Sequence, residues 1–420
     1  MIQQQAILVG VNLQDDARFD VSMKELESLA EACDIEVVGT MSQNLEKVNS
    51  SHYIGLGKVA EVAAYVRGTG AQVVIFNDEL SPSQIRNLDT AIDCEVKDRT
   101  TLILDIFARR AKTTEAKLQV EIAHLQYMLP RLVGLQSALE QQTGGVGTTN
   151  RGAGEKKLEL NRRQIQVRIS KLQKELETLV AQRQTQRRQR KKTGIPVVSL
   201  VGYTNAGKST IMNALLELSD EPEEKRVLEK NQLFATLETA VRSIRLPDNK
   251  SFLLTDTVGF VDKLPHHLVK AFRSTLEEVG ESDLLIHVVD CSHPDYKDQI
   301  TVTNETLAQL GVADIPVIFA FNKVDLVDIP PHSDKRDSVC LSAKNRVGFD
   351  SLLELVRAHL FADYVRCEML IPYGEGDVVS YLNQRAQIFS TEYQQGGTCL
   401  RMECRKADYE KFRRFLVHQA

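Results

Sequence analysis

The sequence predicts a multidomain α/β protein, and three patterns along the chain indicate this fold class. Short β-rich runs at residues 6–11, 36–39 and 73–76 alternate with amphipathic stretches at 23–32 and 59–66, as in a small α/β domain. A second alternation, at residues 195–361, predicts a doubly wound sheet flanked by helices. Between the two, leucine and isoleucine recur at four-three spacing, which predicts two long helices packed as a hairpin.

These patterns divide the 420 residues into four parts. A loop rich in glycine, residues 143–154, joins the two long helices and forms the tip of the hairpin. The last part contains two strand candidates, at 365–371 and 398–404, and two short helices, as in a small α/β domain. The predicted parts are an N-terminal α/β domain (1–112), a basic helical hairpin with the tip loop (113–192), a nucleotide domain (193–362) and a C-terminal α/β domain (363–420).

Composition excludes several classes of protein. The formal net charge is −5, so any surface for nucleic acid has to be local. The seven cysteines lack C-x-x-C spacing, which argues against a disulfide framework and a zinc site. The start of the chain does not resemble a signal peptide, and its apolar runs are shorter than the roughly 18 residues of a membrane span. We therefore expect a cytoplasmic monomer that does not associate with membranes.

A phosphate-binding loop opens the third part. It has the form G-x-x-x-x-G-K-S and connects a strand-like run at 197–201 to a helix-like run at 210–218, which is the context that this motif requires. Its glycines allow backbone N–H groups to surround phosphates, and its lysine places a positive charge at the terminal phosphates. The loop consists of Gly202, Tyr203, Thr204, Asn205, Ala206, Gly207, Lys208 and Ser209.

A D-x-x-G segment predicts a magnesium site and a switch. It consists of Asp256, Thr257, Val258 and Gly259 and follows an apolar strand. The Asp256 carboxylate reaches Mg²⁺ through water and the Ser209 hydroxyl binds it directly, while phosphate oxygens and water complete the octahedral shell. The Gly259 N–H meets the γ-phosphate, and loss of that phosphate frees the segment.

A polar connection between the two motifs offers the second magnesium hydroxyl. Thr236 is the first candidate, and Thr239 is the alternative, because position in the sequence alone does not separate them. We expect Lys208, Thr236 and Gly259 to act together in catalysis. The nucleotide contacts predicted in this connection are Phe234, Ala235, Thr236, Leu237 and Glu238.

An N-K-x-D quartet after another apolar run predicts that the base is guanine. The Asp325 carboxylate can accept hydrogen bonds from the ring N–H and the amino group of guanine, whereas adenine lacks this pair of donors and would leave the carboxylate unpaired. Asn322 would contact the carbonyl edge of the base. The quartet is Asn322, Lys323, Val324 and Asp325, and the loop predicted to close over the base is Ser342, Ala343 and Lys344. GTP is therefore the expected nucleotide.

Two residues bear on the rate of hydrolysis. Many GTPases have glutamine after D-x-x-G to orient the attacking water, but this chain has Phe260. We therefore expect slow hydrolysis by the isolated protein and a partner that completes the site. Asn205 occupies the position of the monovalent-ion ligand in potassium-stimulated GTPases, so K⁺ is a possible second cofactor beside Mg²⁺; an ordinary loop asparagine is the alternative.

With these motifs the sequence resembles the HflX family of ribosome-associated GTPases, within the Obg-HflX superfamily. The resemblance extends from about residue 10 to beyond residue 400. Besides the nucleotide motifs, the stretches that support it are YIGLGK (53–58), DELSPSQ (78–84), residues 98–111, LQVE (118–121), LPRL (129–132) and GGVG (144–147). The chain departs from the usual family pattern at 148–157, where many members have an R-G-P-G-E-T-Q type of run, and at 238–240, where D-P-T is more usual.

The resemblance implies an architecture and a role. The implied architecture is an N-terminal α/β domain, a helical hairpin, a Ras-like GTPase domain and a small C-terminal domain. The implied role is to bind the large ribosomal subunit and its RNA and, with GTP, to split stalled or hibernating ribosomes into subunits, with hydrolysis stimulated by the ribosome. The alternative is a factor for large-subunit assembly or quality control that uses GTP as a timer.

The charge of the hairpin independently favours RNA as a partner. Residues 151–192 contain 14 lysine or arginine residues and 4 acidic residues, a local net charge of +10. A run of this kind is often only a solvated helical face, but the excess of one sign in an acidic protein indicates phosphate contacts. The predicted RNA-binding residues are Arg151, Arg183, Arg187, Arg188, Arg190, Lys191 and Lys192.

A glycine-containing turn at residues 55–58 allows two interpretations. It could hold a second phosphate, since an ATP-responsive N-terminal domain has been discussed for members of the family. The turn is too short to be specific, and a tight turn into a helix is the favoured interpretation.

Overall fold

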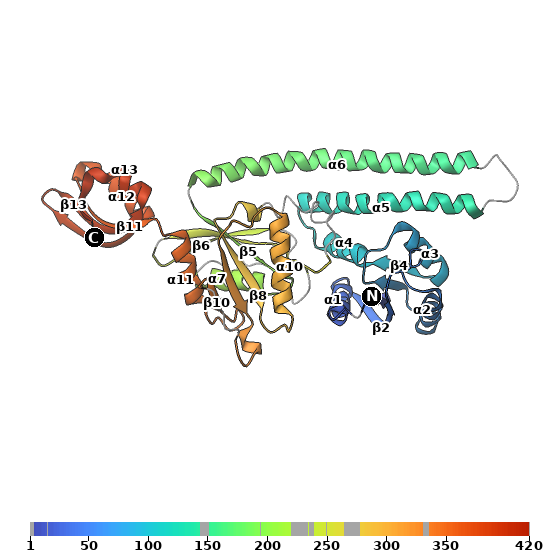
Figure 1. Cartoon of the computed structure of the whole chain (residues 1–420). Coiled ribbons are helices and arrows are strands. Elements are labelled where there is room, and N and C mark those ends of the chain that lie inside the picture. Colours follow the sequence, from blue (N-terminus) through green and yellow to red (C-terminus); the bar gives the residue numbers. More distant parts are fainter. Residues whose placement is uncertain are drawn as a thin grey trace. The chain divides into compact units, whose positions relative to one another are not determined.

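The computed structural model describes residues 4–14, 16–142, 151–193, 195–219, 234, 239–248, 250–263, 278–330 and 336–419. These residues form three sheets and a pair of long helices (Figure 1). The predicted α/β multidomain fold class is confirmed. The chain separates into two compact units, and each is described by itself.

The N-terminal domain is built on a parallel four-stranded sheet in the order β2-β1-β3-β4. All four residues of β3 are buried, because helices cover a sheet of this kind on both faces. The strands are β1 (Gln4–Leu13), β2 (Ile35–Leu45), β3 (Val73–Phe76) and β4 (Glu95–Asp98). The helices are α1 (Phe19–Ala32), α2 (Leu56–Thr69), α3 (Pro82–Ile92) and α4 (Arg99–Arg110).

The turn at residues 55–58 leads into α2. The Gly55 N–H donates a hydrogen bond to Gln43 Oε1 at 2.9 Å, and the Lys58 side chain pairs with Glu61 at 2.9 Å. The Gly55 N–H and the Lys58 ammonium group therefore both have partners within the N-terminal domain.

Asp98 connects this domain to the first long helix. Its carboxylate is fully buried and caps α4 by accepting the Thr101 N–H at 2.9 Å. The same carboxylate accepts the Leu80 N–H at 3.0 Å, an Arg131 guanidinium N–H at 2.9 Å and the Tyr127 hydroxyl. A buried carboxylate is tolerated only when hydrogen-bond donors surround it. Arg131 and Tyr127 belong to α5 and supply two of these donors, so the Asp98 charge holds α5 to the N-terminal domain.

Two long helices, α5 (Thr114–Gln142) and α6 (Arg151–Thr193), run side by side as the predicted hairpin (Figure 1). Leu118 and Ile122 of α5 pack against Ile169 and Leu172 of α6 at the four-three spacing found in the sequence. Residues 151–154 were expected in the tip loop, but they begin α6, because each added residue of a long helix gains a backbone hydrogen bond. Residues 143–150, the rest of the tip loop, lie outside the described residues.

The third domain is a six-stranded sheet in the order β10-β9-β8-β5-β7-β6, in which only β6 pairs antiparallel to its neighbour within the described part of the sheet. Its core includes Val198, Leu200, Ile286 and Ile318, all fully buried. The strands are β5 (Val197–Gly202), β6 (Ala240–Arg245), β7 (Ser251–Asp256), β8 (Leu284–Asp290), β9 (Val317–Asn322) and β10 (Ser338–Cys340). The helices are α7 (Lys208–Leu218), α10 (Tyr296–Gln309) and α11 (Phe349–Leu360).

The C-terminal domain has a split β-α-β-β-α-β topology, with an antiparallel sheet in the order β12-β13-β11-β14. The sequence predicted only the two central strands, β11 and β13. It missed the edge strands because β12 is largely polar and exposed and β14 has only four residues. The elements are β11 (Tyr364–Ile371), α12 (Gly376–Arg385), β12 (Gln387–Gln394), β13 (Gly397–Arg405), α13 (Lys406–Lys411) and β14 (Leu416–Gln419).

Among the helices in the described ranges, none combines the length and apolar character needed to cross a bilayer. This includes the two hairpin helices, which are long enough but too polar.

The packing of the hairpin can be tested by truncating one leucine. Leu172 is 1% exposed, so Leu172→Ala should lower the free energy of unfolding of the hairpin by about 2–5 kcal/mol. Val167→Ala on the same helix, where the side chain is 63% exposed, should change it by less than about 0.5 kcal/mol. Hydrogen exchange of the α5 and α6 amides measures both, and equal protection in the two variants would contradict the packing described here.

Candidate nucleotide site

The phosphate loop joins β5 to α7, and both of its glycines lie where a Cβ atom would not fit. Gly202 has φ 143°, and a Cβ there would lie 2.2 Å from the Val288 carbonyl oxygen. Gly207 has φ 97°, and a Cβ there would lie 2.2 Å from Asn322 Nδ2. Residues with a side chain rarely adopt such φ angles. The backbone conformation and the lack of space for a Cβ therefore both exclude other residues at these two positions.

Lys208 is buried at the first turn of α7. Its ammonium group donates hydrogen bonds to the carbonyl oxygens of Gly202 at 3.1 Å and Tyr203 at 2.7 Å. Burial lowers the pKa of this lysine to about 8, and the nearby Asp256 carboxylate partly opposes that shift. A bound phosphate would raise this pKa, because an anion at the ammonium group offsets the loss of solvent.

The groups expected to hold magnesium lie together. The Ser209 hydroxyl donates to Asp256 Oδ2 at 2.6 Å, and Asp256 is fully buried at the end of β7. Hard oxygen donors, one neutral and one anionic, are the ligands that Mg²⁺ prefers beside phosphate and water. The described residues contain no cluster of three or more acidic, histidine or cysteine side chains that could bind a metal by itself.

The D-x-x-G segment begins in a fixed position. The buried Thr257 hydroxyl donates to the Leu200 carbonyl oxygen at 2.6 Å, which attaches the segment to β5. Phe260, which follows the motif, is only 2% exposed. Gly259 and Val258 are described residues, and Val258 is buried.

Asn322 connects the phosphate loop to the loop predicted to close over the base. Its side-chain amide donates to the Ala206 carbonyl oxygen at 2.8 Å and accepts the Ala343 N–H at 2.9 Å. The residue is 2% exposed, so both hydrogen bonds form away from solvent. The sequence predicted a contact with the base for Asn322 but did not predict this link between loops.

The Asp325 carboxylate, which the sequence predicts to recognise guanine, is held in place but accessible. Asp325 lies in a short 3₁₀ helix (Val324–Leu326) and is exposed. The Ser342 hydroxyl donates to Asp325 Oδ1 at 2.6 Å and in turn accepts the Asn345 N–H at 3.1 Å. Lys323 pairs with Asp290 at 2.6 Å, a contact that the motif alone did not reveal. Ser342 and Ala343 are buried and Lys344 is exposed.

The remaining predicted site residues are described only in part. Ala235, Thr236, Leu237 and Glu238 lie outside the described residues, so the choice between Thr236 and Thr239 stays a prediction. Arg151 and the run from Arg183 to Lys192 belong to α6, but their side chains lie outside the description. The Phe234 side chain is described and packs on Phe107 of α4, with ring centroids 4.8 Å apart.

A sheet that presents these loops at the carboxyl ends of its strands is that of a P-loop GTPase. Three protein families match consecutive parts of the chain: "GTP-binding GTPase N-terminal" at residues 20–108, "GTP-binding GTPase Middle Region" at 110–190 and "50S ribosome-binding GTPase" at 197–323. The chain belongs to the HflX family of GTPases, as its sequence predicted, and it binds guanine nucleotides and hydrolyses GTP.

The similarity to individual relatives covers almost the whole chain. GTPase HflX of Caldanaerobacter subterraneus is 43% identical over 99% of this chain and 94% of the relative. The protein of the same name from Alkalihalophilus pseudofirmus is 44% identical over 93% of this chain and 90% of the relative. That of Escherichia coli is 39% identical over 91% and 88%.

Gly207→Ala tests the link between the loops. The new methyl group would displace the Asn322 amide, and loss of a buried hydrogen bond costs about 1–3 kcal/mol, so affinity for GTP and GDP should fall at least about tenfold. Fluorescence titration with a labelled guanine nucleotide measures this. Gly374→Ala is the control, because a Cβ there meets nothing within 4 Å. Unchanged affinity in Gly207→Ala would refute the proposed constraint.

Asp325→Asn tests base recognition. An asparagine amide places a donor opposite a donor of guanine, so GTP should bind roughly 100-fold more weakly, whereas xanthosine triphosphate, with a carbonyl at that edge, should bind more tightly. Asp328→Asn, at another exposed aspartate of the same loop, is the control. Calorimetry with both nucleotides decides the point, and an unchanged preference for GTP would exclude Asp325 from recognition.

Proposed function

We propose that this GTPase binds the large ribosomal subunit and, in its GTP-bound form, splits stalled or hibernating ribosomes into subunits in the cytoplasm. Full-length similarity to HflX GTPases and a match at residues 197–323 to the family described as "50S ribosome-binding GTPase" support a ribosomal partner. The observation that carries the proposal is the concentration of positive charge on one helix of the hairpin.

The positive charge of the hairpin is concentrated on one helix, so that this helix can bind RNA. Residues 151–192, almost all of α6, have a local net charge of +10 in a chain of net charge −5. The packed leucines and isoleucines of α5 and α6 hold this charge on a stiff hairpin. Lysine and arginine contacts to phosphates supply much of the affinity for structured RNA and make it depend on salt.

The nucleotide controls ribosome binding because the form with GTP binds the ribosome more tightly than the form without it. When GTP is bound, the Lys208 ammonium group compensates charge on the terminal phosphates of the nucleotide. Ser209 would hold the magnesium ion directly, and Asp256 would hold it through water. The magnesium ion, when bound, neutralises charge that develops on the phosphates during hydrolysis. Thr236 and the Gly259 N–H respond to the third phosphate, so only the GTP form stabilises the ribosome-bound arrangement.

Hydrolysis is slow until the ribosome completes the site. Phe260 stands where many GTPases have glutamine, and an apolar, buried side chain does not orient water.

Asn205 has φ 59° within the phosphate loop, and we assign it as the potassium ligand. Equal hydrolysis rates in potassium and sodium would contradict that assignment.

Sucrose-gradient sedimentation of whole ribosomes tests the proposal. With GTP or a non-hydrolysable analogue, the protein should convert whole ribosomes into free subunits, and Lys208→Ala should not. Conversion into subunits supports splitting, whereas association with large subunits without conversion would instead identify an assembly or quality-control factor.

Neutralising part of the basic run tests the role of the hairpin. Replacing Arg187, Arg188 and Arg190 by Gln should weaken ribosome binding and reduce the slope of log affinity against log salt by about 2–3 units. Replacing the exposed Lys24, Lys47 and Arg67 by Gln is the matched control, because it removes the same charge from the N-terminal domain. Equal losses in both variants would mean that only net charge matters.

A further inference from the structure

An arginine just beyond the S-A-K motif attaches the loop over the base to the helix that starts at the phosphate loop. Arg346 Nε donates to Glu217 Oε2 at 2.8 Å, and Arg346 Nη2 lies 2.7 Å from the same oxygen. Glu217 belongs to the last turn of α7, the helix that begins with Lys208. The ion pair therefore joins two parts of the nucleotide site that lie 129 positions apart in the chain.

The same guanidinium group also binds its own loop. Arg346 Nη1 donates to the carbonyl oxygen of Ala343, the middle residue of the S-A-K motif. Ala343 is buried, and its N–H donates to Asn322 Oδ1 at 2.9 Å. A guanidinium group is planar and presents its N–H groups at fixed angles, so binding Glu217 and Ala343 together sets the position of the loop relative to α7.

The backbone of the loop does not favour this shape by itself. Ser342 and Val347 close the loop with two backbone hydrogen bonds, of 3.1 and 3.2 Å. Arg346, between them, has φ 59°, in the left-handed region that residues other than glycine rarely adopt. Such a conformation persists only where its surroundings hold it. The two contacts of the Arg346 side chain supply a hold of this kind.

The position of the loop reaches the Asp325 carboxylate through one hydroxyl group. Ser342 Oγ donates to Asp325 Oδ1 at 2.6 Å and accepts the N–H of Asn345, the residue before Arg346, at 3.1 Å. A shift of the backbone at Arg346 would therefore move the donor that keeps this hydroxyl pointing at Asp325. The chain of contacts from Glu217 to Asp325 lies within one domain.

We propose that Arg346 and Glu217 are positioning residues for the base of the nucleotide, which hold the loop against α7 so that Ser342 keeps Asp325 oriented toward guanine. The proposal rests on the predicted role of Asp325 and is independent of ribosome splitting. One helix then fixes both ends of the ligand, because α7 begins with Lys208 at the phosphates and ends with Glu217 at the base loop.

Nucleotide titrations of the full-length protein test this inference. Arg346→Ala loses both contacts, so GTP should bind about five- to tenfold more weakly. Glu217→Gln keeps the contact with Ala343 and should lose only about twofold, as expected for a partly exposed ion pair. The double variant should bind GTP no more weakly than Arg346→Ala alone, because both residues act through one contact. Arg414→Ala is the matched control, since it breaks an ion pair with Glu375 in the C-terminal domain.

Comparison of ligands separates positioning of the base from damage to the whole site. Inosine triphosphate lacks the exocyclic amino group of guanine, so the preference for GTP over this nucleotide should shrink in Arg346→Ala. Inorganic tripolyphosphate, which has no base, should bind as it does to the unaltered protein. KM for GTP should rise while kcat stays the same.

Two results would overturn the inference. One is an unchanged preference for GTP over inosine triphosphate in Arg346→Ala, and the other is an equal loss of affinity for all three ligands. Asp325→Asn shows which step failed. If that variant loses its preference for GTP and Arg346→Ala does not, base recognition by Asp325 stands and only the role of Arg346 and Glu217 falls.

Discussion

The nucleotide site depends on one buried amide. The Asn322 side chain binds the Ala206 carbonyl oxygen and the Ala343 N–H, so the phosphate loop and the base loop keep a fixed separation. Those loops follow β5 and β10, strands that do not pair with each other, and β9 with Asn322 at its end lies in the same sheet. A ligand with phosphates at one end and a base at the other needs this spacing before it arrives, since ordering two loops on binding would reduce affinity.

Burial makes the same site sensitive to the nucleotide's charge. Lys208 is 7% exposed and Asp256 is fully buried, so both charges have lost most of their contact with water. A depressed lysine pKa shows that the carboxylate only partly offsets this loss. A triphosphate with magnesium would supply compensating charges, so an interior that is unfavourable for isolated ions suits a ligand of that kind.

The sequence was sufficient where chemistry restricts residue type, and insufficient where position in space decides. The motifs place Gly202 at the end of a strand, Lys208 at the start of a helix and Asp325 just after another strand, and the structure has all three there, because each motif requires that local context. The leucines of the hairpin could be predicted from their spacing alone. The polar edge strand β12 could not, because no apolar alternation marks it, and neither could the hydrogen bonds of Asn322 or Arg99, which join residues 116 and 163 positions apart. Sequence separation of that size leaves no local pattern to read.

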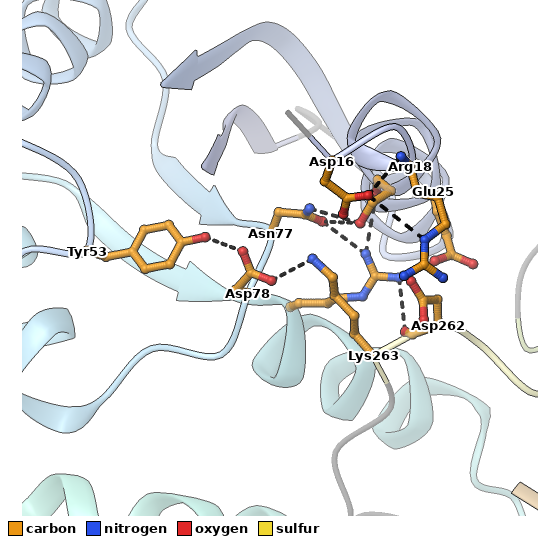
Figure 2. Close-up of polar contacts among 10 residues, drawn as sticks. Asp16, Arg18, Glu25, Tyr53, Asn77, Asp78, Asp262 and Lys263 are labelled. Carbon is orange, nitrogen blue, oxygen red and sulfur yellow. Dashed lines mark hydrogen bonds and ion pairs between the residues drawn. The ribbon is translucent and has the colours of Figure 1, made fainter. Parts of the chain in front are cut away.

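Two adjacent charged residues, Asp98 and Arg99, attach segments from other parts of the chain to the N-terminal sheet. The Arg99 guanidinium donates to the Asp262 carbonyl oxygen and is fixed by Asn77 and Glu25 within its own domain (Figure 2). Asp98, next to it, ties α5 to the same domain through Arg131 and Tyr127. Both charges are almost fully buried, and a buried charge is tolerated only while its partners stay in place. The start of the segment after D-x-x-G and the first helix of the hairpin are therefore attached to the same sheet by charges that would be left unpaired without them.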